Sequence, residues 1–201
     1  MHPYRSKNLE FTSFDAAKHD EALFQIHSQA ESWIKGTPQL KGPMDRKYHD
    51  KVVTNLQELF LFVVINKVVV NTDSEEPAGQ RTLIPIGRVS LKHTGLDMTH
   101  HRSCSVGILI GEEYQGQGYG AETVSWLLDW AFKYANMNRV ELNVFEWNLR
   151  AIEMYKRVGF KEEGRKRQAL WHDGRFWDDV GMGILQSEWR EMRAKESQVI
   201  S

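Results

Sequence analysis

The sequence predicts one α/β (α+β) domain with a mixed, mostly antiparallel β-sheet of about seven strands and helices on both faces. Three observations support this fold class. Short apolar strands separated by polar turns occupy the first half of the chain, and one strand–helix–strand–helix unit follows between residues 104 and 158. Two further strands, joined by a turn that contains Asp173-Gly174, close the pattern. A single parallel crossover among hairpins is typical of an α+β fold.

The first elements combine a strand with two helices. Residues 9–14 alternate apolar and polar side chains, which predicts a strand. Asp15 is a suitable N-cap for a helix that continues to about Trp33. The predicted apolar face of that helix consists of Ala22, Leu23, Ile26 and Ala30. Residues 35–43 contain two Gly and two Pro and form a loop, and residues 45–57 form a second helix.

Strands are expected in the next part of the chain. Residues 58–67 are rich in aromatic and β-branched side chains and predict a strand. Residues 71–79 form a polar turn or excursion. Residues 83–92 predict another strand, in which Pro85 indicates an edge position or a bulge because proline cannot donate a ladder hydrogen bond. Residues 93–101 are expected to be loop.

The second half contains the strand–helix unit and the hairpin. Its expected strands are 104–110, 139–145, 160–171 and 176–185, and its expected helices are 118–136 and 149–158. The first of these helices turns Val124, Leu127, Leu128 and Ala131 inward. We see no repeat and no linker, so residues 1–201 are expected to form a single domain.

Composition limits the function classes. The chain has 201 residues, 41% hydrophobic and 26% charged, as in an ordinary soluble domain. A net charge of −1 without a long basic run argues against nucleic acid and anionic membrane surfaces as partners. The longest apolar run, Leu59–Ile65, is too short to span a bilayer. Residues 1–5 lack the apolar segment of a secretory signal, and a single cysteine, Cys104, fits a reducing compartment, so we expect a cytoplasmic protein.

A glycine-rich turn between a strand and a helix is the strongest functional signal. Gly116, Gly118 and Gly120 allow unusual dihedral angles and close approach of the backbone to a ligand. The N–H groups of such a turn and of the first helical residues point at one spot, with the positive end of the helix dipole behind them. The segment therefore predicts a phosphate or pyrophosphate site.

Two familiar phosphate motifs fit less well. A Walker A loop requires Lys and Ser/Thr after its last glycine, and neither follows Gly120. A dinucleotide fingerprint is matched literally by Gly116, Gly118 and Ala121, with Glu141 as the acid for the ribose. That second match stands alone, because antiparallel strands precede it and only one parallel crossover follows.

A family resemblance accounts for more of the chain. The run Gln115-Gly-x-Gly118-x-Gly120 resembles the pyrophosphate-binding signature of the GCN5-related N-acetyltransferases (GNAT), which bind acetyl-CoA there. A second run, from Asn148 through Ala151 and Tyr155 to Gly159-Phe160, resembles the family's Asn-x-x-Ala-x-x-x-Tyr-x-x-x-Gly-Phe segment. Residues 164–180 are similar to the ribosomal-protein and polyamine (RimJ/RimL-like) branch, and the resemblance is strong over about residues 86–185.

The resemblance implies the GNAT fold, acetyl-CoA as cofactor, CoA as product and direct acetyl transfer to a primary amine without a metal. The cofactor-binding residues that it implies are Ile108, Leu109, Ile110, Gln115, Gly116, Gln117, Gly118, Tyr119, Gly120 and Asn148. The amide of Leu109 or Ile110 would donate to the thioester carbonyl. Asn148 would touch the cofactor arm, although a helix N-cap explains an Asn there equally well. Tyr155 would protonate the leaving thiolate, since phenol and thiol have reference pKa values of about 10 and 8.5.

The general base is open. Many relatives carry Glu where this chain has Ser105, which puts a carboxylate base from this strand in doubt. The remaining candidates are His100 and His101, Glu112 and Glu113, or a water chain.

The acceptor is open as well, because the first helices and the terminal hairpin set it in this fold. Acidic residues that favour a small cationic amine or polyamine are Glu21, Glu31, Asp173, Asp178 and Asp179. Aromatic residues that favour an apolar acceptor are Trp33, Trp171 and Trp177. We expect a small-molecule or polyamine acceptor. The alternatives are a protein N-terminus or lysine, or a CoA-binding module without catalysis. A homodimer that uses residues 189–201 is compatible with the resemblance.

Overall fold

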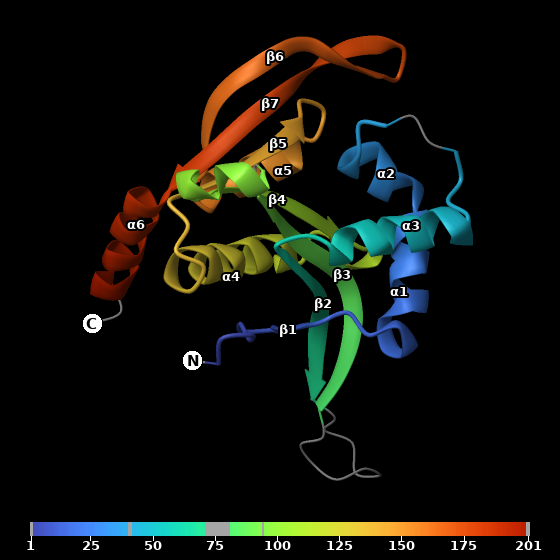
Figure 1. The fold of residues 1–201 in the computed structure, drawn as a ribbon, viewed down its shortest axis with the longest axis horizontal. Coiled ribbons are helices and arrows are strands. Elements are labelled where there is room, and N and C mark those ends of the chain that lie inside the picture. Colours follow the sequence, from blue (N-terminus) through green and yellow to red (C-terminus); the bar gives the residue numbers. More distant parts are fainter. Residues whose placement is uncertain (1, 40–41, 71–80, 94, 200–201) are drawn as a thin grey trace. The chain divides into compact units, whose positions relative to one another are not determined.

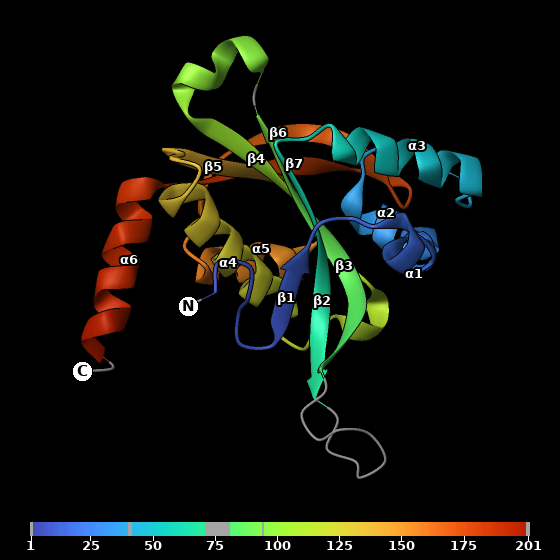
Figure 2. The same ribbon diagram turned by 60° about the horizontal axis from the view of Figure 1, so that its bottom comes forward.

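The structure is a computed structural model and describes residues 2–39, 42–70, 81–93 and 95–199, with the side chains of residues 31–33, 96 and 199 left out of the description. The strands are β1 (Leu9–Thr12), β2 (Leu61–Val70), β3 (Arg81–His93), β4 (Ser103–Ile110), β5 (Arg139–Phe145), β6 (Lys161–His172) and β7 (Arg175–Leu185). They form one seven-stranded sheet in the order β1-β2-β3-β4-β5-β7-β6 (Figures 1 and 2). β4 and β5 are parallel, whereas β1–β2, β5–β7 and β6–β7 are antiparallel, which confirms the predicted mixed sheet.

The helices accompany these strands in the expected order. They are α1 (Ala16–Ser28), α2 (Ala30–Gly36), α3 (Arg46–Gln57), α4 (Tyr119–Lys133), α5 (Leu149–Arg157) and α6 (Gln186–Val199), with the 3₁₀ helices η1 (Leu96–His101) and η2 (Glu112–Tyr114). Contacts divide the chain into two compact units. The first unit comprises residues 1–90 and 108–123, and the second unit comprises residues 91–107 and 124–201. Each is described below by itself.

In the first unit, α1 packs on β2 but is shorter than predicted. Asp15 caps it as expected, accepting a hydrogen bond from the backbone N–H of Ala17 at 3.1 Å. Leu23 and Ile26 are buried against Val64 of β2. The expectation of one helix to Trp33 is wrong, because the backbone of Gln29 is extended (φ −65°, ψ 133°) and separates α1 from α2.

The strands of the first unit surround that core. β1 pairs with β2 from Leu9↔Lys67 to Thr12↔Val64. β3 lies between β2 and β4 in the sheet order, so the edge position suggested by Pro85 is wrong. Pro85 is half-buried directly before the buried part of the strand, which begins at Ile86. The predicted excursion at residues 71–79 lies outside the described residues.

The second unit is organised by its hairpin and by the inner face of α4. β6 and β7 form a long hairpin (Figure 1). Asp173 (φ 48°) and Gly174 (φ 76°) form its two-residue connection, in which both residues have positive φ as a type I′ turn requires. β7 also pairs along the whole of β5. The four residues predicted to face inward from helix α4 are all buried, namely Val124, Leu127, Leu128 and Ala131.

Two elements of the second unit were not predicted. Residues 96–101, expected as loop, form η1. The C-terminal residues form α6, whose Trp189 is buried against Phe132 of α4, with ring centroids 5.4 Å apart. Asp129 of α4 accepts hydrogen bonds from Trp189 Nε1 at 3.0 Å and from Arg193. Most of the other residues of the helix are polar, Met192 being an exception, which explains why the helix gave a weak hydrophobic pattern.

Candidate functional site

The glycine turn follows β4 in the first unit. The N–H of Gly111 donates to the carbonyl of Ile86 in β3 at 2.9 Å, and η2 then leads the chain to Gln115. Gly116 (φ 82°) and Gly118 (φ 89°) both have left-handed backbones, which only glycine adopts without strain. Helix α4 starts directly afterwards, at Tyr119. The structure therefore contains the strand–turn–helix geometry that the sequence predicted.

The glutamine side chains of the turn hold the turn itself. Gln115 Nε2 donates to the carbonyl of Ile110 at 3.0 Å, and Gln117 Nε2 donates to the carbonyl of Glu113 at 2.8 Å. The backbone N–H of Gln115 is also used internally, since it donates to the carbonyl of Glu112. Of the six amides expected to face a phosphate, that of Gln115 is thus already bonded.

The next five amides have no such partner. Within the described residues, the backbone N–H groups of Gly116, Gln117, Gly118, Tyr119 and Gly120 donate to no recorded acceptor. They stand at the N-terminus of the 15-residue helix α4, where the helix dipole favours a negative charge. Successive unpaired N–H groups at a helix N-terminus can hold a phosphate or pyrophosphate.

One carboxylate in this first helical turn is bound elsewhere. Glu122 accepts hydrogen bonds from Ser6 Oγ at 2.7 Å, from the backbone N–H of Asn8 at 2.6 Å and from Asn8 Nδ2 at 2.9 Å. The N-terminal segment therefore supplies three hydrogen bonds to the carboxylate in the first turn of α4.

The strand before the turn is fixed by a close backbone contact. Leu109 packs against the buried cluster of Leu23, Ile26 and Val64. A Cβ atom at Gly87 of β3 would overlap the carbonyl oxygen of Leu109, so this position requires glycine. Gly87 was not predicted as a site residue, although an isolated glycine inside a strand is a recognised sign of close backbone approach. Gly87 thus determines how closely β3 approaches Leu109 and Ile110, two predicted cofactor contacts. Ile108, the third predicted contact in this strand, is the first residue of β4 that belongs to the first unit.

Asn148 and Tyr155 lie in the second unit, on α5. Asn148 Oδ1 accepts from the backbone N–H of Ala151 at 3.3 Å, which confirms the N-cap interpretation. Tyr155 is 7% exposed and packs edge-on against Phe160, with ring centroids 5.6 Å apart. Burial raises the pKa of Tyr155 to about 12, so its phenol is protonated at neutral pH but is a weaker acid than an exposed tyrosine.

The candidate bases lie on two different 3₁₀ helices, η1 and η2. His100 and His101 are exposed on η1, and their rings are tilted against each other with centroids 3.9 Å apart. Cys104, which was not a candidate base, is fully buried, and burial raises the pKa of its thiol to about 12. Glu112 and Glu113 are exposed on η2. None of these positions combines burial with a polarising partner, so no base is singled out.

The acidic residues considered for the acceptor are mostly engaged within the chain. Glu21 pairs with Arg46. Asp178 Oδ1 accepts from the backbone N–H of Gln168, and Asp179 Oδ2 accepts from Asn143 Nδ2 at 2.9 Å. Asp173 is exposed in the hairpin turn. The side chains of Glu31 and Trp33 lie outside the described residues.

The aromatic candidates lie on the hairpin. Trp171 is 64% exposed and touches Phe176, which is 57% exposed. Trp177 lies under the guanidinium of Arg175, 3.4 Å from the ring centroid, and contacts Trp147 edge-on at 5.8 Å. Exposed rings of this size are available to an acceptor or a partner.

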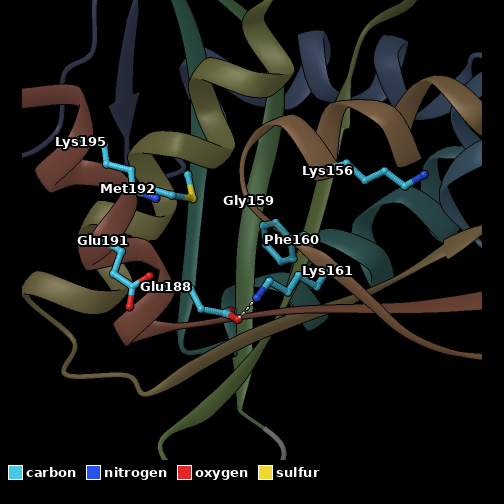
Figure 3. A pocket seen from close by; sticks show the side chains of 8 residues that line it. All are labelled: Lys156, Gly159, Phe160, Lys161, Glu188, Glu191, Met192 and Lys195. Carbon is cyan, nitrogen blue, oxygen red and sulfur yellow. Dashed lines mark hydrogen bonds and ion pairs between the residues drawn. The ribbon is translucent and has the colours of Figure 1, made fainter. Parts of the chain in front are cut away.

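A pocket of about 310 Å³ lies beside α5 and α6 (Figure 3). Its lining includes Phe160, Met192 and the ion pair between Lys161 and Glu188, whose atoms are 2.6 Å apart. It contains none of the predicted site residues. Within residues 2–39, 42–70, 81–93 and 95–199, no group of three or more His, Cys, Asp or Glu side chains could hold a metal ion. The described helices include none with the length and apolarity of a membrane span.

Comparison with known proteins gives a family match. Residues 8–161 match the family model "Acetyltransferase (GNAT) domain". The spermidine N(1)-acetyltransferase of Vibrio cholerae serotype O1 is 35% identical over 89 residues, which cover 44% of this chain and 51% of that protein. The [ribosomal protein uS5]-alanine N-acetyltransferase of Escherichia coli K12 is 26% identical over 87 residues, covering 43% and 45%. The chain thus spans about half the length of the curated relatives it matches.

Solved structures agree with the fold. The crystal structure of the Vibrio cholerae spermidine N-acetyltransferase in complex with CoA and spermine has a TM-score of 0.69 and 22% identity, covering 92% of this chain and 99% of that one. The same enzyme has also been described as a dodecamer. At this level of identity the likeness confirms the predicted fold class.

Proposed function

The chain belongs to the GNAT acetyltransferase family, and we propose that it transfers the acetyl group of acetyl-CoA directly to a primary amine of a small molecule or polyamine. The observation that carries the cofactor part is the row of unpaired amides from Gly116 to Gly120 at the N-terminus of α4. A pyrophosphate would accept hydrogen bonds from them and lie at the positive end of the helix dipole.

The proposal assigns a role to each remaining predicted residue. The backbone of Ile108, Leu109 and Ile110 would align the pantetheine arm, and an amide of this strand would donate to the thioester carbonyl. Asn148 would add the Nδ2 donor that its capping role leaves unused. Holding both reactants in place is the main contribution, because near-attack placement lowers a barrier by about 7–11 kcal/mol.

The transfer itself needs one nucleophile and two proton movements. The neutral amine nitrogen attacks the thioester carbonyl carbon, and the C–S bond breaks as the tetrahedral intermediate collapses. The amine loses a proton to water or to a base. Tyr155 gives its phenolic proton to the departing thiolate and regains one from solvent, so the products are the acetylated amine and CoA.

The small-amine acceptor is supported by relatives that are named spermidine N(1)-acetyltransferases. Exposed Asp173 is the acidic hairpin candidate with no charge partner recorded among the described residues. The second candidate, a protein N-terminus, is favoured by the exposed pair Trp171 and Phe176, which could contact a peptide chain. It is also in keeping with the relative that acetylates a ribosomal protein.

The deciding measurement is thermal stabilisation with acetyl-CoA, CoA, NAD and NADP side by side. A ligand that binds only the folded state adds about 2.7 kcal/mol at a hundredfold excess over its Kd. We expect acetyl-CoA and CoA to raise the Tm and the nicotinamide cofactors to leave it unchanged. Stabilisation by NAD or NADP alone would favour the dinucleotide fingerprint and contradict the proposal.

The acceptor is then decided by thiol release. Spermidine, a short aromatic amine and a peptide with a free N-terminal alanine are compared at equal concentration. The highest kcat/KM should come from the polyamine. A higher value for the peptide would select the second candidate, and CoA binding without release from any amine would indicate a binding module. Light scattering at several protein concentrations tests whether the chain forms a homodimer.

A further inference from the structure

Helix α1 ends at Gln29, and the side chain of this residue binds the segment that leads into the glycine turn. Gln29 Oε1 accepts a hydrogen bond from the backbone N–H of Glu112 at 2.9 Å. Gln29 Nε2 donates to Glu113 Oε2 at 3.1 Å. Both ends of the amide are therefore engaged by consecutive residues of η2, and all three residues lie in the first unit.

These contacts supply a cap that η2 lacks. Its own N-cap residue is Gly111, which has no side chain to bond the first N–H group. The amide of Gln29 occupies that role from a distant part of the chain. A neutral amide fits, because it can accept from the backbone and donate to the Glu113 carboxylate at the same time.

The far end of η2 is tied to the turn. The carbonyl of Glu113 accepts from Gln117 Nε2, and the carbonyl of Glu112 accepts from the backbone N–H of Gln115. Gln29 is thus two hydrogen bonds away from the first unpaired amides. Displacement of η2 would shift Gln115 and Gln117, and with them the direction in which Gly116 and Gly118 present their N–H groups.

The break in α1 follows from the same contact. No glycine or proline ends this helix, yet the backbone of Gln29 is extended. Ile26, one turn earlier, packs near Gly111, where a Cβ atom would lie 3.2 Å from Ile26 Cγ1. The end of α1 is therefore fitted to the start of η2 through both apolar and polar contacts.

We infer that Gln29 is a positioning residue for the cofactor, because it holds η2 and so fixes the amides of the glycine turn in the orientation that binds pyrophosphate. This inference rests on the proposed function. If Gln29 has this role, the end of α1 contributes to acetyl-CoA affinity as well as lying in the region expected to determine acceptor specificity.

The first test compares Gln29→Ala with Gln25→Ala. Gln25 is a matched control, because it lies one turn earlier on α1 and bonds only Glu21 at the surface among the recorded contacts. A hydrogen bond of this kind corresponds to about a three- to tenfold effect. We expect Gln29→Ala to raise the Kd and KM for acetyl-CoA three- to tenfold relative to Gln25→Ala, with kcat at saturation close to that of Gln25→Ala. Because the cap of η2 is lost, the Tm of Gln29→Ala without ligand should be a few degrees lower.

The second test exchanges the amide of Gln29 and the carboxylate of Glu113. Gln29→Glu alone places a carboxylate against Glu113 and should weaken acetyl-CoA binding more than Gln29→Ala does. The pair Gln29→Glu with Glu113→Gln restores one acceptor and one donor, and should return the Kd to within about threefold of the unaltered protein. Recovery of affinity by the double variant identifies the contact itself.

The outcomes separate the two claims. If the unaltered protein does not bind acetyl-CoA, the proposed function fails. If it binds and Gln29→Ala binds equally well, or Gln25→Ala is equally impaired, the positioning role is wrong while the function stands. A double variant that binds no better than Gln29→Glu would also contradict it.

Discussion

The Nδ1 atoms of His27 and His49 lie 3.0 Å apart in the buried interior of the first unit. Arg88 Nε donates to His27 Nε2 at 2.9 Å, so the remaining ring proton of His27 is on Nδ1 and is donated to His49. His49 then donates from Nε2 to Asp20 at 3.2 Å. The four side chains form one chain of hydrogen bonds from a buried cation to a carboxylate.

The first prediction concerns the acceptor of this buried cation. Burial lowers the pKa of Arg88 to about 10, which shows how strongly the site disfavours an unsatisfied charge. His27→Phe removes the acceptor of the Arg88 Nε–H and should destabilise the protein by about 1.5–3 kcal/mol in urea unfolding. His100→Phe, at an exposed ring, is the control. Adding Arg88→Met to His27→Phe should recover part of the loss, and no recovery would contradict this explanation.

The second prediction tests the pyrophosphate site. Gly118 and Gly174 both have positive φ, and a Cβ atom at either would meet no other atom within 4 Å. Alanine at each should therefore cost a similar amount of stability, roughly 1–2 kcal/mol. We expect only Gly118→Ala to raise the Kd for acetyl-CoA, by tenfold or so on the scale of one impaired charge-assisted contact. Calorimetric titration of both variants checks this, and equal affinities would refute the assignment.

The third prediction concerns the proton donor. Tyr155→Phe keeps the ring that packs on Phe160 and removes the hydroxyl. The kcat should fall on the order of 10²-fold, as for loss of a general acid, while the Kd for acetyl-CoA stays within about twofold. Tyr134→Phe, at an exposed position, is the control. Parallel losses of kcat and affinity would instead indicate a packing role.

The fourth prediction separates the two roles of Asn148. Asp is as good an N-cap as Asn, whereas Ala costs about 1 kcal/mol. Asn148→Asp should thus retain the stability of the unaltered protein but lose the Nδ2 donor, and its Kd for acetyl-CoA should rise. Asn148→Ala should both lower the stability and raise the Kd for acetyl-CoA. Unchanged affinity in Asn148→Asp would leave only the capping role.

The fifth prediction is an acid-dependent loss of stability at His19. Burial, opposed in part by the charge of Asp15, lowers the pKa of His19, and its Nδ1 accepts the backbone N–H of Asp15 at 2.9 Å. The unfolded chain, with a pKa of 6.5, therefore binds more protons, so stability must fall as the pH drops through that value. His19→Gln should lose less stability between about pH 7 and pH 5 than the unaltered protein. His100→Gln should not differ from it, and identical acid slopes for all three would contradict the prediction.

Local patterns were sufficient for much of the fold. The cap at Asp15, the inner face of α4 and the Asp173-Gly174 turn depend on neighbours within a few residues, and each is found where the pattern placed it. Their energies come from short-range hydrogen bonds, periodic burial and allowed dihedral angles.

What the patterns missed depends on distant contacts. Gln29 ends a helix because its side chain bonds residues 83 and 84 positions away. Helix α6 is held by Trp189 and Arg193 on Asp129 of α4, and most of its other residues are polar. The glycine turn could be predicted because its glycines carry the signal, whereas Gly87 acts only through the carbonyl of Leu109 opposite it. No local rule encodes such pairs.

Ser6 and Asn8 donate hydrogen bonds to the Glu122 carboxylate, so the N-terminal segment affects the electrostatic potential at the start of α4. Without them, a carboxylate two residues into the helix after Gly120 would turn its full charge toward any anion bound at the turn. Removal of residues 2–8, or a fusion that displaces them, is then expected to lower the affinity for the cofactor. The N-terminal segment thus directs the charge of Glu122, which lies 114 positions after Asn8, away from the turn.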